Sequence, residues 1–124
     1  MDIQRVTRIA AVQAAGHLFD AVPARETIER FLADEGRHIL IAYVNGVPAG
    51  VATGVETPHP DQGTEMFLYE LGVDNRYKSR GVGRALVLAL ARLARERGCR
   101  GLWTATGESD RPAPATYESA GGTS

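Results

Sequence analysis

The spacing of apolar residues changes character along the first part of the chain. Apolar and polar positions alternate over residues 2–6, which predicts a short half-buried strand. Residues 9–20 and 24–35 are predicted as two helices, with Thr7 placed to cap the first. Pro23 suits the start of the second helix, where its missing N–H costs nothing.

A hairpin signal follows these helices. The apolar run at 38–44 is followed by Asn45-Gly46, a pair typical of two-residue turns between antiparallel strands. The chain is therefore predicted to return as a strand over 47–56. Pro48 is expected near the turn, where a lost ladder hydrogen bond is tolerated.

The second half alternates strands with helices. Two prolines and a glycine predict a loop at 57–63, and the next strand is predicted over 65–73. Residues 82–97 have one apolar stripe with arginines largely opposite it, which predicts an amphipathic helix. A strand over 101–106 and a short helix near 113–120 complete the prediction.

A basic, glycine-punctuated loop joins the predicted strand at 65–73 to the helix at 82–97. The segment Glu70–Arg84 has the sequence ELGVDNRYKSRGVGR. The start of a helix has unpaired backbone N–H groups and a partial positive charge, so such a loop is suited to bind a phosphate. The residues that would present donors to it are Lys78, Ser79, Arg80, Gly81, Val82, Gly83 and Arg84.

Two common phosphate loops do not fit this sequence. The chain has no Walker run, and a dinucleotide fingerprint fails because Leu86 stands where the third glycine belongs. What remains is a basic residue, two further residues and then Gly-x-Gly, which resembles the acetyl-CoA pyrophosphate loop of the GNAT N-acetyltransferases. Within that superfamily, EMFLYELGV at 65–73 is most similar to the aminoglycoside 3-N-acetyltransferase branch. The alternative is a helix that merely begins after a glycine-rich turn.

The predicted order of elements is also that of the GNAT fold. The resemblance implies an α/β fold with a mixed sheet in the order β-α-α-β-β-β-α-β-α, as a single acetyl-CoA-binding domain over residues 1–124. It also implies a gap between the strands at 65–73 and 101–106 that admits pantetheine. Family members continue with further strands, whereas this sequence ends after the last helix, so we expect a truncated member or a sheet completed by another subunit.

Two residues are candidates for the chemistry of acetyl transfer. Glu70 lies in an otherwise apolar run, and a desolvated carboxylate binds protons more tightly, so it is a candidate base acting through a bound water. The alternative is a structural ion pair with an arginine. Tyr117, in the predicted last helix, resembles the family's tyrosine that protonates the CoA thiolate; the alternative is an aromatic anchor for that helix.

The resemblance assigns further residues to acetyl-CoA. Leu71 and Val73 are expected to contact pantetheine through their backbone groups, and an N–H near Val73 to polarise the thioester carbonyl. The 78–84 loop is expected to hold the pyrophosphate. Asp110 occupies a position where many family members have an Asn that bonds pantetheine.

The composition of the chain limits the classes of partner and cofactor that we expect. The chain has 14 basic and 15 acidic residues and a net charge of −1, which gives no reason to expect nucleic acid or an acidic membrane. Cys99 is the only cysteine and is expected to be a small buried hydrophobe. The three histidines lack a paired ligand spacing, so no metal site is expected. No targeting or membrane-spanning segment is recognised, which predicts a cytoplasmic protein.

The acceptor is predicted to be a small primary amine. Acidic residues in or beside the loops expected to flank the acceptor cleft suit an aminoglycoside or another polyamine: Asp61, Glu65, Glu108 and Asp110. A peptide N-terminus or a lysine side chain remains open. Another possibility is a non-catalytic domain that binds acetyl-CoA without turnover. An uncovered sheet edge further predicts a homodimer.

Overall fold

A computed structural model describes residues 1–61 and 63–104 of the chain. It contains a five-stranded mixed sheet in the order β1-β2-β3-β4-β5, in which β1 to β4 are antiparallel and β5 is parallel to β4. The α/β fold predicted from the sequence is confirmed. The strands are β1 (Asp2–Val6), β2 (Arg37–Val44), β3 (Val47–His59), β4 (Gly63–Val73) and β5 (Leu102–Thr104).

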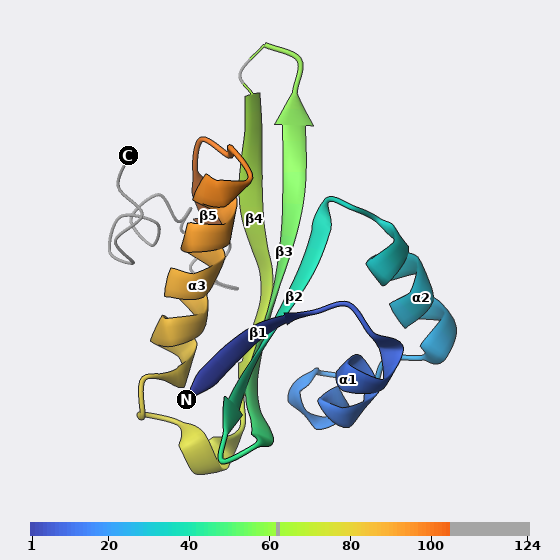
Figure 1. The fold of residues 1–124 in the computed structure, drawn as a ribbon, viewed down its shortest axis with the longest axis vertical. Helices are drawn as coiled ribbons and strands as arrows, with labels where there is room; N and C mark the ends of the chain where they lie inside the picture. The colour runs from blue at the N-terminus through green and yellow to red at the C-terminus, as the bar shows by residue number, and fades with distance from the viewer. Residues whose placement is uncertain (62, 105–124) are drawn as a thin grey trace.

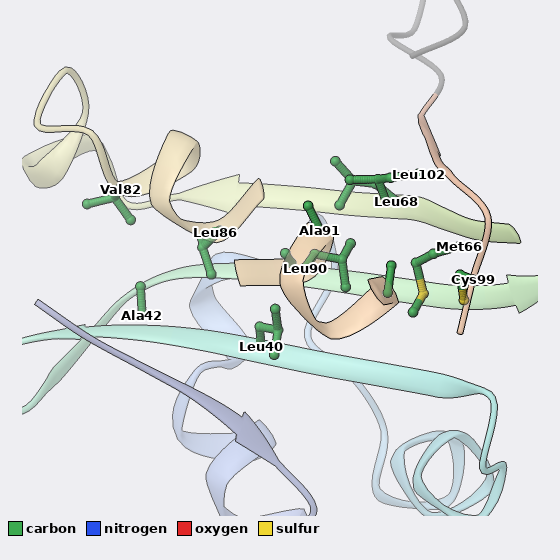
Figure 2. Packing of buried hydrophobic residues seen from close by; sticks show 12 residues of the cluster. Leu40, Ala42, Met66, Leu68, Val82, Leu86, Leu90, Ala91, Cys99 and Leu102 are labelled. Atoms are coloured by element: carbon green, nitrogen blue, oxygen red, sulfur yellow. The ribbon is translucent and has the colours of Figure 1, made fainter. Parts of the chain in front are cut away.

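Helices cover both faces of this sheet (Figure 1). On one face lies α3, whose arrangement over β2 is shown in Figure 2, with Leu86 and Leu90 close to Ala42 and Leu40. The helices on the opposite face pack on Ile41 and its neighbours. The helices are α1 (Ile9–Ala14), the 3₁₀ turn η1 (Gly16–Leu18), α2 (Arg25–Ala33), the 3₁₀ turn η2 (Asn75–Tyr77) and α3 (Val82–Glu96).

The first helix is shorter than the sequence predicts. It ends at Ala14 and continues as the 3₁₀ turn η1, so the single helix expected at 9–20 is wrong. Thr7 does not cap it: Arg8 is the N-cap residue and makes no side-chain cap hydrogen bond. The helix predicted at 82–97 is observed as α3, which ends at Glu96; Gly98, just after the C-cap residue Arg97, has a left-handed φ of 78°, as is typical at a helix C-terminus.

The loop predicted at 57–63 is also wrong. Strand β3 continues to His59, and β4 begins at Gly63. Pairing of β3 with β2 extends only to Val55, so the continuation pairs with β4 alone. Pro58 is therefore at a position with one free edge, where the absence of a backbone N–H costs no ladder bond.

A β-bulge interrupts the pairing of β3 with β4. Thr53 is opposite Glu70, but Gly54 is opposite Leu68, which leaves Tyr69 as an extra residue. The bulge reverses the alternation of side chains along β4. Buried Leu68 precedes it, and Tyr69, Glu70 and Leu71 are then exposed in succession.

A glycine brings η1 against β4 just beyond this bulge. A Cβ on Gly72 would lie 2.4 Å from the carbonyl oxygen of Leu18, so no other residue fits without a shift of the backbone. This contact holds the segment after η1 close to the bulge. Among the described residues, no helix is both long and apolar enough to cross a membrane.

The predicted helix at 113–120 and the end of the strand predicted at 101–106 lie outside the described residues. Leu88 on α3 is partly buried and packs against the core.

Candidate active site

The basic loop predicted to bind phosphate forms one wall of a cavity of about 500 Å³. Strand β4 contributes Leu71 and Val73 to it. The loop contributes Lys78, Ser79 and Gly81, and the first turn of α3 contributes Val82, Gly83 and Arg84. Eight of the predicted cofactor residues are thus brought together at the start of one helix.

The backbone of this loop curls as a phosphate loop requires. Ser79 has a φ of 64° and Gly81 a φ of 81°, and α3 begins immediately afterwards at Val82. A Cβ on Gly83 would have ordinary contacts of 3.7 Å with Val73 and 3.9 Å with Leu71, both of which line the cavity. The glycine therefore leaves space between helix and strand where an anion can approach the backbone. The cradle fits a pyrophosphate.

Arg80 is not among the described residues that line this cavity. The guanidinium of Arg80 lies 5.8 Å from the centre of the Tyr77 ring. Tyr77 itself lines the cavity, and its role was not recognised in the sequence. Asp110, like the candidate acid Tyr117, lies outside the described residues.

The carboxylate of Asp74 fixes the turn that precedes the phosphate loop. Asp74 caps η2 by accepting a hydrogen bond of 2.9 Å from the backbone N–H of Arg76. This bond and the side-chain contact with Arg76 lower the pKa of Asp74. His17 belongs to η1, and its Nε2 atom lies 3.6 Å from the same carboxylate. These contacts connect the phosphate loop to the opposite side of β4.

The described pairing of β4 with β5 ends before β4 reaches this cavity. In the described part of the chain, the parallel pairing covers Met66 to Leu68 on β4 and Leu102 to Thr104 on β5. Beyond the bulge at Tyr69, backbone groups of β4 that point away from β3 are not paired with these residues. A pantetheine chain that enters here would meet such groups, as the resemblance implies.

Glu70 lies at the bulge, on an exposed part of β4. The expectation of a desolvated carboxylate in an apolar run is therefore wrong, because the bulge turns this residue toward solvent. The hydroxyl of Thr53, which is 1% exposed, donates a 3.2 Å hydrogen bond to Glu70 Oε1. The hydrogen-bond partner of Glu70 is thus a threonine rather than the arginine of the structural alternative.

Glu70 also borders a second cavity, of about 290 Å³, on the α1 and α2 side of the sheet. Apolar side chains from α1, α2, β2 and the segment between the helices form most of its wall, among them Phe19, Phe31 and Ile39. The polar residues that line it are Asp20, Thr27, Thr53 and Glu70.

A third, polar cavity has lining residues in common with both of these cavities. It shares Phe19 and Asp20 with the apolar one, and Leu71, Val73 and Lys78 with the cavity of the phosphate loop. Glu70 lines the apolar cavity, and its neighbour Leu71 lines the other two. The geometry allows a ligand held by the loop to meet, beside a carboxylate, a second ligand that enters from the α2 side.

Of the four acids expected to flank the acceptor cleft, the two that the structure describes do not line this cavity. Glu65 is at the opposite end of β4, where its carboxylate is 3.4 Å from His59 Nε2, and Asp61 is in the turn between β3 and β4. Glu108 and Asp110 lie outside the described residues. The acidic residue at the cavity that sequence reasoning missed is Asp20, whose position depends on the contact between η1 and Gly72.

A buried polar cluster near the C-terminus of α3 is separate from this site. His38 is 1% exposed; its Nδ1 accepts a 2.9 Å hydrogen bond from Arg5, and its Nε2 is 2.7 Å from Glu56 Oε2. Arg97 donates to the same carboxylate oxygen. Burial lowers the pKa of His38, and the Glu56 hydrogen bond only partly offsets it. The cluster links β1, β2, β3 and α3 in the core.

Two further expectations concern Cys99 and metals. Cys99 is buried, as expected, and burial raises the pKa of its thiol, which suits a packing role. In the part of the chain that the structure describes, no group of three or more His, Cys, Asp or Glu residues is arranged to hold a metal ion.

Comparisons with known proteins agree with this geometry. The sequence model of the acetyltransferase (GNAT) family matches residues 5–122. No curated protein matches the chain at a significant level.

Solved structures share the fold at low sequence identity. An aminoglycoside acetyltransferase from an uncultured soil metagenomic sample, in complex with trehalose, is 18% identical with a TM-score of 0.80, over 96% of this chain and 86% of its own. The aminoglycoside N-acetyltransferase AAC(6')-Iy in complex with CoA is 21% identical with a TM-score of 0.73, over 97% and 86%. The ribosomal-protein-alanine N-acetyltransferase from Brucella melitensis biovar Abortus 2308 is 22% identical with a TM-score of 0.73, over 86% and 80%. At these identities, the likeness establishes the fold.

Proposed function

Because the chain belongs to the GNAT acetyltransferase family, an acyl-CoA N-acyltransferase family, we propose that it transfers the acetyl group of acetyl-CoA directly to a primary amine. The observation that carries this proposal is the position of Glu70. This carboxylate lines the apolar cavity on the α2 side, and the next residue on β4, Leu71, lines the cavity of the phosphate loop. Each substrate then has its own cavity, and the reacting atoms meet beside β4.

The proposed reaction needs one proton acceptor and one proton donor. The amine nitrogen attacks the thioester carbonyl carbon, so a C–N bond forms and the C–S bond breaks. Glu70, directly or through a water, accepts the proton that the amine loses. Tyr117 is the proposed donor to the departing thiolate, as the family resemblance implies. An N–H near Val73 would stabilise the negative charge that develops on the carbonyl oxygen.

The proposed acetyl-CoA site uses the residues around the start of α3. Lys78, Arg84 and the backbone N–H groups from Ser79 to Gly83 would hold the pyrophosphate, and Arg80 would add positive charge nearby. Leu71 and Val73 would bond pantetheine through their backbone, with Asp110 as a further contact. Support comes from the left-handed backbone at Ser79 and Gly81 and from the wall that Gly83 leaves open.

Several classes of primary amine are candidates for the acceptor. An aminoglycoside or another polyamine is one candidate, because several similar structures are titled aminoglycoside acetyltransferases, one of them in complex with sisomicin. A protein N-terminus is another, since a similar structure is titled a ribosomal-protein-alanine N-acetyltransferase. We also propose that the protein is cytoplasmic and that it forms a homodimer. Sedimentation across micromolar concentrations tests the homodimer.

The competing function is a domain that binds acetyl-CoA without turnover. A continuous assay of free CoA thiol separates the two, with and without a panel of primary amines. We expect amine-dependent release of CoA. Saturable binding of acetyl-CoA with no release above the uncatalysed rate for any amine would favour the binding domain.

A further inference from the structure

The cavity beside Glu70 has a mainly apolar interior. Val12 and Ile28 line it and are 1% and 3% exposed, and Phe19, Phe31 and Ile39 extend the same surface. Such a wall offers few hydrogen-bond partners to a hydroxyl or an amino group. It gains free energy instead when an apolar ligand group leaves water, at roughly 25 cal/mol per Å².

Among residues 1–61 and 63–104, the charged residues that line this cavity are all acidic. They are Asp20 and Glu70, and no lysine, arginine or histidine of these ranges lines it. A single ammonium group near them would be attracted to both carboxylates. Beside Phe31 and Ile28, a second ammonium would lose its water without a charged partner among the adjacent described side chains.

The volume of the cavity limits the ligand further. At about 290 Å³ it is at the lower end of the ~300–1,000 Å³ that small-molecule pockets span. One aromatic ring with a short alkyl chain fits a space of this order. An aminoglycoside, with several linked polar rings, would leave most of its bulk outside.

We infer that the acceptor is a primary amine carried on one compact aromatic group, an arylalkylamine, rather than a polyamine or an aminoglycoside. The inference rests on the proposed function, because it assigns the apolar cavity to the acceptor. The ring packs among Phe19, Phe31 and Ile39, and the amino group lies near Glu70, on the side where the third cavity leads to Leu71 and Val73.

The first experiment compares kcat/KM for four probes under saturating acetyl-CoA: 2-phenylethylamine, ethanolamine, spermidine and sisomicin. We expect 2-phenylethylamine to exceed each of the others by at least tenfold, since apolar groups of this size are worth roughly 10- to 100-fold in a hydrophobic pocket. Equal or faster acetylation of spermidine or sisomicin would overturn the inference and leave the proposed function intact.

A pair of variants tests whether this cavity sets the preference. Thr27 lines the cavity and is exposed, so Thr27→Asp adds a carboxylate to the wall without disturbing the core. Ala33→Asp adds the same charge to the same helix outside the cavity. We expect Thr27→Asp to lower the ratio of 2-phenylethylamine to spermidine activity at least fivefold, and Ala33→Asp to leave it unchanged. An unchanged ratio in both variants would place the acceptor elsewhere.

Direct binding keeps the inference testable if no amine is acetylated. In that case the proposed function fails, and titration calorimetry with CoA present decides the ligand class of the cavity. Tighter binding of 2-phenylethylamine than of ethanolamine, weakened in Thr27→Asp but not in Ala33→Asp, would support the inference. Equal affinity for the two probes would refute it.

Discussion

The buried hydroxyl of Thr53 donates a 3.2 Å hydrogen bond to the exposed carboxylate of Glu70, at the point where the register of β3 and β4 changes. The bulge turns the glutamate toward solvent at the rim of the apolar cavity, and the threonine holds one of its oxygens. A rigid strand pair thus orients a group that is still open to substrate. This relationship leads to two predictions on turnover.

Glu70→Gln preserves the size of the side chain but removes its ability to accept a proton. We expect kcat to fall by about 10²-fold or more, as is typical for loss of a general base, while acetyl-CoA affinity changes less than twofold. Steady-state kinetics and calorimetry measure the two quantities. Glu65→Gln, on the same strand but outside the cavities, is the control and should retain full activity. Equal activity in Glu70→Gln and the parent would remove Glu70 from the mechanism.

Thr53→Val removes the hydroxyl that orients Glu70 and keeps the branched shape in the core. The carboxylate is exposed and is solvated when its partner is lost, so we expect the free energy of unfolding to change by less than about 1 kcal/mol. Turnover should fall several-fold, because the base loses a fixed orientation. Urea unfolding and initial rates on the same preparation check this. Loss of stability with unchanged turnover would make Thr53 a purely structural residue.

Gly83→Val tests the phosphate loop. A Cβ at this position makes only ordinary contacts with Val73 and Leu71, so the fold accommodates the side chain, whereas the added methyl groups occupy the cavity wall. We expect acetyl-CoA affinity to fall at least tenfold, about 1.4 kcal/mol, without loss of thermal stability in the free protein. Arg92→Val, on an exposed position of α3, is the matched control. Parental affinity in Gly83→Val would move the cofactor to another part of the surface.

The cluster of His38 and Glu56 predicts a dependence of stability on pH. Burial lowers the pKa of His38 in the folded state, so between that pKa and the ordinary value of 6.5 the unfolded chain binds more protons. The contribution of His38 to the free energy of unfolding is therefore complete above pH 6.5, and it is lost as the pH falls from 6.5 toward the lowered pKa. For Glu56, burial acts to raise the pKa, but the hydrogen bonds from Arg97 and His38 outweigh it. The lowered pKa adds a further loss of stability below pH 4.5.

Urea unfolding at about pH 7.5 and about pH 5.5, roughly one unit above and below the ordinary histidine pKa, measures the histidine contribution. His38→Gln should lose the part of the pH dependence that lies just below pH 6.5. The side chain of His59 is 40% exposed, so the control variant His59→Gln should behave as the parent does. The same dependence in the parent and His38→Gln would assign the effect to other groups.

Local signals in the sequence were sufficient for most of the fold. Asn45-Gly46 forms the predicted turn, with φ values of 53° and 78°, because few other pairs adopt that conformation. Gly81 before α3 and Gly98 after it mark left-handed positions that residues with a side chain rarely adopt. The residues of the phosphate loop are contiguous, so the sequence alone brings them together.

What the sequence did not predict depends on contacts between distant segments. The bulge at Tyr69 has no local signature, yet it decides that Glu70 faces solvent rather than the core. Asp20 reaches the site only because η1 packs on Gly72. Pro58 lies in a strand at a point where β2 does not extend beside β3. The composition of the segment cannot reveal where the neighbouring strand stops. The branch of the superfamily, Tyr117 and Asp110 stay predictions.

Transfer of a labelled acetyl group tests the central claim most directly. The purified chain is incubated with acetyl-CoA labelled in its acetyl carbons and a primary amine, and mass spectrometry follows the label. We predict that the label appears on the amine nitrogen together with an equal amount of free CoA, and that Glu70→Gln slows both. Binding of acetyl-CoA with no labelled amine from any acceptor, including arylalkylamines, polyamines and aminoglycosides, would contradict this account.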